Sequence, residues 1–469
     1  MPLEKKYIAV IGIIIILVIG GGIAYWYMTA PKKVTIVVEY GQPWQYLVEN
    51  LTLAKFKEEA KKLGYDVEVT LRMIPYGVDI VQTISQDLAQ GVAGDVLVID
   101  SFMIPEYAEA GYLLDLTSYV EEWDGWAAYP EAMKKIVTYE NKVYGIMIDT
   151  DVRMLWYRKD IFQLAGLPAD WQPTTWEDII EAALTLANNS DTIKDQLNIT
   201  EFYPIYFPAG TKWGEATTMQ GFYMLLLGAD KDPYNRLYDY SENKWVGKSK
   251  ALLRAFQFYY DIYVEHKIAP EEYNFVTDVW SKHREAFAKG WVAIDIGGSW
   301  EWDEGWGPNG IYPIPNREEK VGYAKMPGYA GGAESERPFV TISGGWAVAI
   351  NAAIKPELKP LAWLFVKILA SKENVAKFCA RYGKIAPRTD AAEVPEYAEN
   401  EYLQSVLEYL NFTDFRDAMP GYSKVSFYIQ QATEKIVTEG WTAEQALDWY
   451  YDQLVAEFGE DNVITYPLP

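Results

Sequence analysis

The sequence predicts an α/β fold whose first part is a parallel β-sheet with helices on both faces. Three β-rich runs, residues 33–40, 66–74 and 95–100, alternate with segments of helical periodicity. A β-α-β-α-β order of this kind places consecutive strands parallel in one sheet. The third run, Asp95 to Asp100, is almost wholly apolar between its two ends, which is typical of a strand buried on both faces.

The segments between these strands follow from apolar spacing and end signals. Residues 47–63 share one apolar helical face and stop at Gly64, and residues 80–91 and 104–110 predict two more helices. We expect a short extended piece over residues 112–120. Ligands of parallel α/β sheets bind beyond the carboxyl ends of the strands. In this sequence the strand ends carry polar residues, at Tyr40 to Gln42, Asp100-Ser101 and Asp149 to Asp151.

The stretch from Tyr144 to Leu167 combines a buried-looking strand with a polar interruption. Residues 145–148 are apolar, Asp149 to Asp151 break the run, and it resumes at Val152 before a helix that starts near Lys159. Two carboxylates and Arg153 in such a strand cost free energy unless they face a cleft or pair with one another. A charged loop with an Asp–Arg ion pair is the simpler interpretation.

The rest of the chain is mostly helical, with loops rich in Trp and Tyr. Thr175 is the expected N-cap of a helix, and residues 248–267, 275–290 and 360–382 and the part from about residue 402 are expected to be helical. Within residues 291–307 a strand runs into Gly297-Gly298 and a Trp cluster. Further strands are expected over 321–328 and over 338–351, the latter broken at Gly344-Gly345.

Composition and charge exclude several classes of function. The net charge of -24 argues against nucleic acid as a partner and against docking on anionic lipid. One cysteine, Cys379, excludes an intrachain disulfide and a Cys-based zinc site, and two histidines leave little for a His-rich metal site or a Ser/His/Asp triad. We therefore expect no cofactor and no metal.

The N-terminus predicts a membrane anchor. Residues 7–30 carry no charge and are long enough to span a bilayer, and Lys5 and Lys6 before them place the N-terminus in the cytoplasm. An uncleaved transmembrane helix is preferred to a cleaved signal peptide, which usually has a shorter apolar core. In both cases the chain after about Lys32 lies outside the cytoplasm. Four sequons, at Asn50, Asn188, Asn198 and Asn411, only support this location.

Several motifs then follow in a characteristic order. They are DVLVID with EYAEAGYLLDLT, YGIMIDTDVRMLWYRKDIFQLAGL with PTTWEDIIEAA, REAFAKGWVAIDIGGSWEW, and GGWAVAIN with KPLAWLFVKILASKENVAKF and GKIAPRT. In this order the chain resembles the family 1 extracellular solute-binding proteins of ABC importers, especially the maltose/trehalose and oligosaccharide binders, from about Lys33 onward. It lacks the lipid-anchor cysteine of the bacterial members, so its tethering differs.

The resemblance implies a two-lobed, periplasmic-binding-protein-like fold of type II, with three hinge crossings and the ligand between the lobes. It places the first crossing at Asp149–Arg153. The expected division is residues 1–33 as anchor or signal, 34–149 and 328–385 as the N-lobe, 150–322 and 389–469 as the C-lobe, and 323–327 and 386–388 as the second and third crossings.

The resemblance also assigns ligand contacts. Asp151 matches an acidic residue of the first crossing that binds sugar hydroxyls, with Asp149 in reserve, and Arg153 is expected to orient them. Trp300 matches a Trp that stacks on a sugar ring, and Arg388 stands where related binders use an arginine. Two side chains that follow the first strand and one from the Trp- and Tyr-rich loop of residues 203–218 are added from the sequence itself, and the complete predicted set is Gln42, Trp44, Asp100, Ser101, Asp149, Asp151, Trp213, Ser299, Trp300, Gly345, Trp346 and Arg388.

Sugar chemistry agrees with this choice of residue types. A sugar has apolar C–H faces and a rim of hydroxyls, so a binder needs flat aromatic rings beside charged or amide side chains. Most of these residues also have a purely structural interpretation. Trp300 and Trp346 could pack in the core, Asp100 could cap the helix that follows it, and Trp213 could cover a surface.

The expected function is therefore that of a monomeric binding component, which captures a sugar or oligosaccharide and delivers it to ABC permease subunits. No bond is made or broken. One alternative is a secreted glycoside hydrolase, which needs two carboxyls about 5–10 Å apart. Asp149 and Asp151 could be considered for this role, but no acid on another strand end suggests itself as a partner. A second alternative keeps the fold and changes the ligand to a peptide or a polyamine.

Overall fold

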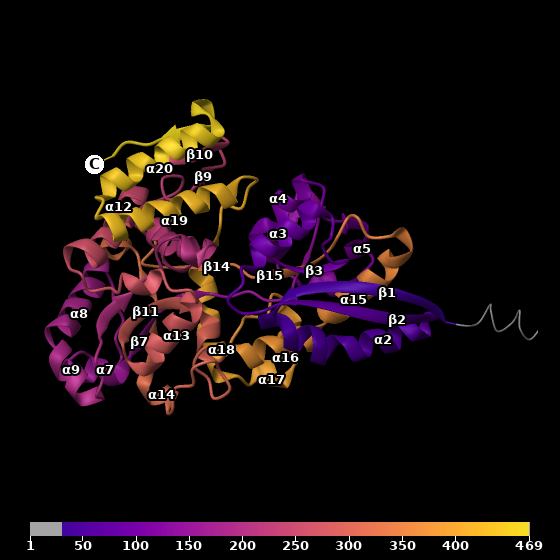
Figure 1. The fold of residues 1–469 in the computed structure, drawn as a ribbon, viewed down its shortest axis with the longest axis horizontal. Coiled ribbons are helices and arrows are strands. Elements are labelled where there is room, and N and C mark those ends of the chain that lie inside the picture. Colours follow the sequence, from indigo (N-terminus) through magenta and orange to yellow (C-terminus); the bar gives the residue numbers. More distant parts are fainter. Residues whose placement is uncertain (1–30, 469) are drawn as a thin grey trace, which may run out of the picture.

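Two β-sheets, each surrounded by helices, form two lobes in the computed structural model, which describes residues 31–468 (Figure 1). The predicted membrane anchor falls on residues that lie outside this range. Among residues 31–468, no helix has the length and apolar character needed to cross a bilayer.

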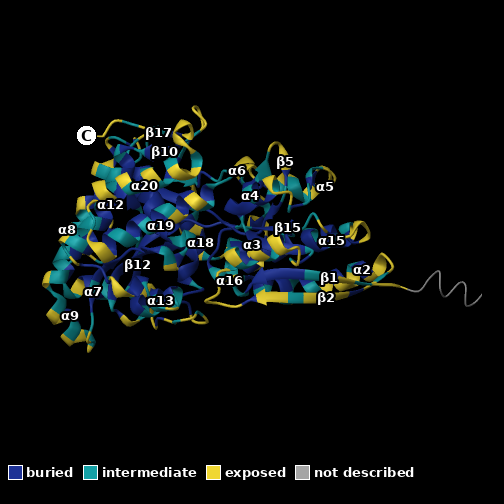
Figure 2. Cartoon of the chain, turned by 45° about the horizontal axis from the view of Figure 1, so that its top comes forward, coloured by how far each residue is buried: buried dark blue, intermediate teal, exposed yellow. Residues whose placement is uncertain are grey.

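The N-lobe is built on a five-stranded sheet in the order β2-β1-β3-β15-β6. β1 pairs in parallel with β2 along its whole length and with β3 near its end, whereas β15 runs antiparallel to both β3 and β6. The predicted parallel β-α-β-α-β arrangement is confirmed. Figure 2 shows β1 buried over its second half and β2 largely exposed or half-buried at the edge of the sheet. The strands are β1 (Lys32–Gly41), β2 (Tyr65–Ile74), β3 (Val96–Asp100), β6 (Ile146–Met147) and β15 (Trp346–Ile350).

Helices pack around this sheet, with α3 and α4 above and α2 and α16 below in the view of Figure 1. The N-lobe helices and the small hairpin are α2 (Leu53–Lys62), α3 (Ile80–Gln90), α4 (Ile104–Glu109), α5 (Thr117–Glu121), α6 (Glu131–Ile136), α15 (Lys359–Leu369), α16 (Lys372–Tyr382), β4 (Thr138–Tyr139) and β5 (Lys142–Val143).

Two predictions for this lobe are wrong in detail. The expected single helix over 360–382 is two helices, because Ser371 has an extended backbone that caps α16. The expected extended piece over 112–120 contains only one bridge, between Leu113 and Asn351, and then turns into α5. The apolar periodicity alone does not reveal either break.

The C-lobe contains a mixed sheet in the order β12-β7-β11-β8. β7 runs antiparallel to β11 and β12, and β11 runs parallel to β8. The strands of this sheet are β7 (Arg153–Arg158), β8 (Tyr203–Tyr206), β11 (Val292–Gly298) and β12 (Val321–Ala324). One smaller sheet contains β13 (Met326–Pro327), β14 (Phe339–Ser343) and β16 (Thr413–Phe415). Another contains β9 (Tyr238–Asp239), β10 (Lys244–Lys248) and β17 (Val463–Thr465).

Helices make up the remainder of this lobe. The predicted cap at Thr175 is confirmed, because its hydroxyl and the side chain of Asp178 form a reciprocal capping box. The helices of this lobe are α7 (Lys159–Leu164), α8 (Trp176–Asn188), α9 (Ser190–Leu197), α10 (Glu215–Thr217), α11 (Tyr223–Ala229), α12 (Lys250–Tyr260), α13 (Val279–Lys289), α14 (Arg317–Lys320), α18 (Glu401–Val406), α19 (Tyr422–Glu439) and α20 (Ala443–Phe458), whereas α17 (Pro395–Ala398) packs against α16 of the N-lobe.

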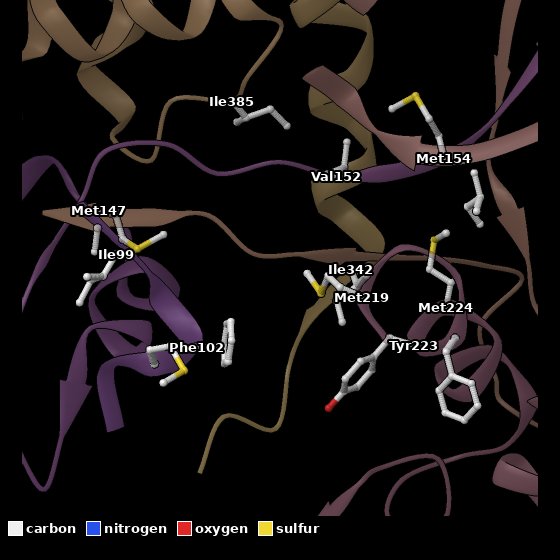
Figure 3. Packing of buried hydrophobic residues seen from close by; sticks show 14 of the residues in the cluster. Ile99, Phe102, Met147, Val152, Met154, Met219, Tyr223, Met224, Ile342 and Ile385 are labelled. Atoms are coloured by element: carbon white, nitrogen blue, oxygen red, sulfur yellow. The ribbon is translucent and has the colours of Figure 1, made fainter. Parts of the chain in front are cut away.

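The chain passes between the lobes three times, and the three passages lie together. The first, Ile148 to Arg153, connects β6 to β7 and contains the segment Asp149–Arg153. Its Thr150 exchanges two backbone hydrogen bonds with Ile385 in the third passage, and the Thr150 hydroxyl donates to the carbonyl of Gly344 in the second, at 2.9 Å. In Figure 3 the segments carrying Val152, Ile342 and Ile385 run side by side.

The second crossing differs from the prediction. The chain crosses at Ser343–Trp346, between β14 and β15, and not at residues 323–327. Residues 321–343 stay with the C-lobe because β12 pairs with β7 and the Trp176 indole donates to the Pro327 carbonyl at 3.0 Å. The second part of the N-lobe therefore starts near residue 345 and not at 328.

The third crossing starts at Lys384 and Ile385, before the predicted 386–388, and ends later than residue 388. Arg388 donates to the Ala370 carbonyl in the N-lobe, and Asn400 still donates to the Ala380 carbonyl of α16, at 3.2 Å. The C-lobe is reached at α18, where the Tyr402 hydroxyl donates to the Ser299 carbonyl at 2.7 Å.

Gly345 is required by the close packing of the first two crossings. Its φ of +125° is unfavourable for residues with a side chain, and a Cβ at this position would lie 2.2 Å from the Asp149 carbonyl oxygen and 3.0 Å from the Thr150 Cα. Both neighbours are backbone atoms, so they cannot move aside without shifting the crossing.

We predict that Gly345→Ala lowers the free energy of unfolding at least twice as much as Gly440→Ala, measured by urea denaturation. Gly440 also has a positive φ, of +68°, but no heavy atom lies within 4 Å of its added Cβ. The control should therefore show only the left-handed backbone cost of about 1 kcal/mol. Equal losses in the two variants would mean that the first two crossings are not in close contact.

Candidate functional site

Asp149 is the point at which the crossings are bound to one another. The carboxylate is 1% exposed and accepts hydrogen bonds from the Trp44 indole at 2.8 Å and from the backbone N–H of Trp346 at 2.9 Å. The Lys384 ammonium lies 3.5 Å away. Burial raises the pKa of Asp149, and Lys384 and the Trp44 hydrogen bond oppose that rise. The Asp149 carboxylate of the first crossing thus binds Trp44 after β1, Trp346 of the second crossing and Lys384 of the third.

Asp151 forms a buried ion pair with Arg153 and also accepts the backbone N–H of Gly344 at 2.9 Å. Arg153 donates further to Gln220 and to the Ile342 carbonyl, both at 3.3 Å. The Asp–Arg pair considered from the sequence is therefore present. It lies between the lobes and not on an exposed loop.

Aromatic rings surround these charges. The Trp300 ring packs over Gly298, where a Cβ would lie 2.0 Å from it, and is only 8% exposed. The guanidinium of Arg153 lies 5.0 Å and the ammonium of Lys384 lies 5.6 Å from the ring centroid. Lys384 also lies 5.1 Å from the Trp44 ring, whose centroid is 4.0 Å from that of Trp346.

We call this set of side chains the hinge cluster. It consists of Trp44, Asp149, Asp151, Arg153, Trp300, Trp346 and Lys384, with rings from both lobes and charges from the crossings.

A second group of charges joins the lobes next to the hinge cluster. Arg416 of the C-lobe pairs with Asp100 at the end of β3 at 2.6 Å and with Glu215 at 3.1 Å. The Tyr422 hydroxyl donates to Glu215 at 2.7 Å. Burial raises the pKa of Glu215 to about 7, with Asp100 adding to the rise and Arg416 opposing it. Two carboxylates thus share one guanidinium across the lobe boundary.

Other contacts cross the same boundary. The Tyr76 hydroxyl donates to Glu304 at 3.4 Å, and the Ser423 hydroxyl donates to Glu106 at 2.9 Å. The Phe102 ring packs edge-on against Tyr422 with centroids 5.5 Å apart. The lobes therefore contact each other on both sides of the hinge cluster. Within residues 31–468 no group of three or more His, Cys, Asp or Glu side chains is arranged to hold a metal ion.

Most of the predicted site residues lie at this boundary. Trp44, Asp149, Asp151, Trp300 and Trp346 belong to the hinge cluster itself. Five further predicted residues are adjacent to it. Gln42 begins the turn that carries Trp44 and accepts the Tyr76 N–H, and Asp100 pairs with Arg416. Ser101 donates its N–H to the carbonyl of Gly345, and Ser299 donates its N–H to the Val152 carbonyl.

Two predicted residues lie elsewhere. The indole of Trp213 donates to the Tyr206 hydroxyl at 2.9 Å and packs against Trp280 in a separate core cluster. Arg388 pairs with Asp390 at 2.7 Å, and its guanidinium lies 5.4 Å from the Tyr129 ring. The structure thus gives both side chains a role in packing the lobes and brings neither to the hinge cluster.

Sequence reasoning missed Lys384, Arg416 and Glu215. Lys384 lies two residues before the predicted third crossing, 386–388, so its position was a usable signal. Arg416 follows β16, a short strand that has no apolar alternation to reveal it. Glu215 is the first residue of α10, inside the aromatic loop that we expected to contribute Trp213.

A family model describing bacterial extracellular solute-binding proteins matches residues 37–376. Among solved structures, an ABC transporter solute-binding protein from Thermotoga lettingae, bound to α-D-tagatose, superposes with a TM-score of 0.72, at 24% identity over 90% of this chain and 98% of its own. Maltose-bound MalE3 of T. maritima gives 0.71 at 22% identity, over 91% and 100% of the two chains. At these identities the likeness establishes the fold.

Two curated relatives match in part. A lactose-binding protein of Rhizobium radiobacter is 29% identical over 140 residues, which are 28% of this chain and 32% of the relative. A putative binding protein of Brucella abortus is 28% identical over 123 residues, 24% of this chain and 29% of the relative. The chain thus spans about a third of the length of the curated relatives it matches.

We predict that Lys384→Met destabilises the protein by about 3–5 kcal/mol at pH 8, because it leaves the Asp149 carboxylate buried without its cation. Without Lys384 to oppose it, burial raises the folded pKa of Asp149 further above its unfolded value, so the cost is largest at high pH and shrinks as pH falls through that folded pKa. Below the unfolded value of about 4 the carboxyl is neutral in both states. Urea unfolding at pH 5 and pH 8 measures this difference.

The matched control is the double variant Lys384→Met with Asp149→Asn, which removes the buried charge together with its partner. It should recover most of the stability at pH 8. A Lys384→Met deficit of the same size at both pH values, or no recovery in the double variant, would contradict the assigned ion pair.

Proposed function

Because this chain belongs to the bacterial extracellular solute-binding proteins, we propose that it captures a sugar or oligosaccharide between its lobes and delivers it to the permease of an ABC importer. On this proposal it is a binding protein that acts as a monomer, and no bond of the ligand is made or broken. Maltose- and trehalose-type glucosides are the first candidates.

The observation that carries the proposal is the composition of the hinge cluster. Three Trp rings from two lobes lie around two carboxylates, a guanidinium and an ammonium at the place where all three crossings meet. Flat rings suit the C–H faces of a sugar, and charged donors and acceptors suit its hydroxyls. A ligand held here contacts both lobes and so favours the conformation in which they are close.

The partners of each charge suggest how the ligand is accommodated. Both oxygens of Asp149 are engaged by Trp44, Trp346 and Lys384, so this carboxylate mainly organises the crossings. Asp151 takes the hydroxyl of the ligand, with Arg153 orienting it. Lys384 belongs to the third crossing and covers the Trp300 ring, so it is displaced when the ring stacks on a sugar.

Tethering is part of the same proposal. The uncharged segment at residues 7–30, preceded by Lys5 and Lys6, anchors the chain with its lobes outside the cytoplasm. A tethered binding protein stays within reach of its permease without a lipid-modified cysteine.

A ligand panel tests the proposal directly. We expect at least one of maltose, maltotriose, trehalose and lactose to raise the melting temperature of the protein by mass action. Spermidine and a tripeptide are tested beside them as ligands that are not sugars. A shift with spermidine or the tripeptide alone would retain the fold and replace the ligand class. Release of reducing ends from maltotriose would instead identify a glycoside hydrolase.

We predict that Trp300→Ala weakens binding of the sugar found in that panel by about 1–3 kcal/mol, because a stacking ring is lost from the hinge cluster. Isothermal titration calorimetry measures the change. The control is Trp449→Ala, since Trp449 is a half-buried residue of α20 that packs on Tyr428. It should bind sugar as the unaltered protein does. Equal affinities for all three proteins would remove Trp300 from the site.

A further inference from the structure

A fully buried carboxylate lies directly behind Trp300. Glu301 is 0% exposed, and its Oε1 atom accepts the Trp300 indole N–H at 2.7 Å. The turn that follows wraps closely around this side chain, since a Cβ on Gly305 would lie 2.2 Å from Glu301 Oε2. The indole therefore has a fixed hydrogen-bond partner, which sets the orientation of its ring.

Arg284 of α13 holds this carboxylate from the other side. Its Nε atom donates to Glu301 Oε2 at 2.8 Å and its terminal nitrogen donates to Oε1 at 3.0 Å, which is a two-point contact of guanidinium with carboxylate. The same nitrogen donates to Glu304 at 3.1 Å. Burial alone would raise the pKa of Glu301, but Arg284 and His283 outweigh it and hold that pKa at about 2. Glu301 is therefore ionised at neutral pH.

His283 extends the network away from Trp300. Its Nδ1 atom lies 2.9 Å from Asp295 and its Nε2 atom lies 3.8 Å from Glu301. Arg284 and His283 are each 3% exposed, and Asp295 is 0% exposed. A buried ion network of this kind contributes little net stability compared with apolar residues of the same shape. Its geometry is more specific than apolar packing, and the atom that it fixes is the Trp300 nitrogen.

We propose that Arg284 and Glu301 are positioning residues of the ligand site. They hold the Trp300 ring in the orientation in which it faces Arg153 and Lys384, and they set the affinity for a sugar without touching it. This inference rests on the proposed function, because it assigns the network to the ring that is to stack on the sugar.

The test uses a double variant that removes both charges and keeps the shape, Arg284→Met with Glu301→Leu. Replacing the two partners together leaves no unpaired charge at position 301. Glu304 loses its contact with Arg284 and keeps the hydrogen bond from the Tyr76 hydroxyl, so the melting temperature of the double variant is measured first. We expect affinity for maltotriose, with trehalose and lactose as further probes, to fall about tenfold by calorimetry, because Trp300 is no longer held in place. The melting temperature reports the fold independently.

The decisive comparison is the same double variant in a Trp300→Ala background. If the network acts through Trp300, the further loss of affinity there is close to zero. A second tenfold loss in the absence of the ring, or an unchanged affinity in the double variant alone, overturns the inference.

A measurement without ligand separates this inference from the proposed function. In protein labelled with 5-fluorotryptophan, the fluorine resonance of Trp300, identified by its absence in Trp300→Phe, should shift or broaden in the double variant, while that of Trp449 stays in place. If no sugar binds the unaltered protein, the proposed function fails. If the Trp300 resonance is unmoved in the double variant, the positioning role fails, whether or not a sugar binds.

Discussion

The carboxylate of Asp149 is the interaction on which the arrangement of the two lobes depends. It is buried at the first crossing and is bound by Trp44 from the end of β1, by Trp346 from the second crossing and by Lys384 from the third. Leaving such a carboxylate without partners would cost several kcal/mol, so the four segments are constrained to meet. The position of every other side chain of the hinge cluster follows from this meeting point.

A consequence is that the candidate site is filled by the protein's own charges when the lobes are close. Arg153 and Lys384 lie near the Trp300 ring, and Arg416 lies between Asp100 and Glu215 across the lobe boundary. A sugar that enters must replace some of these contacts with its own hydroxyls and C–H faces. Affinity is then a difference between two sets of contacts, which favours a ligand of matching shape over one that is merely polar.

The regular parts of the fold were predictable because their signals are local. Apolar alternation and end residues located β1, β2 and β3, and the threonine and acid spacing at Thr175 located the start of α8. The second crossing was placed wrongly at residues 323–327, because what keeps that segment on the C-lobe is the pairing of β12 with β7 and the contact of Trp176 with Pro327. These partners are distant in sequence.

The same reason explains the uneven result for the candidate site. Residues placed at strand ends or crossings, such as Trp44, Asp149 and Trp346, do lie together, because topology alone brings those positions to one edge. Trp213 was chosen for its residue type and packs in a separate core. Arg416 is 316 residues from Asp100 in the chain, and only the contact between the two lobes gives it a partner there.

The central claim is that a sugar binds at the hinge cluster, and a crystal structure of the protein with the sugar that stabilises it most would test that claim directly. The account predicts a sugar ring in van der Waals contact with Trp300, a hydroxyl hydrogen-bonded to Asp151, and Lys384 moved off the Trp300 ring. A sugar bound outside the lobe boundary, with Asp151, Trp300 and Lys384 in the arrangement described above, would contradict it.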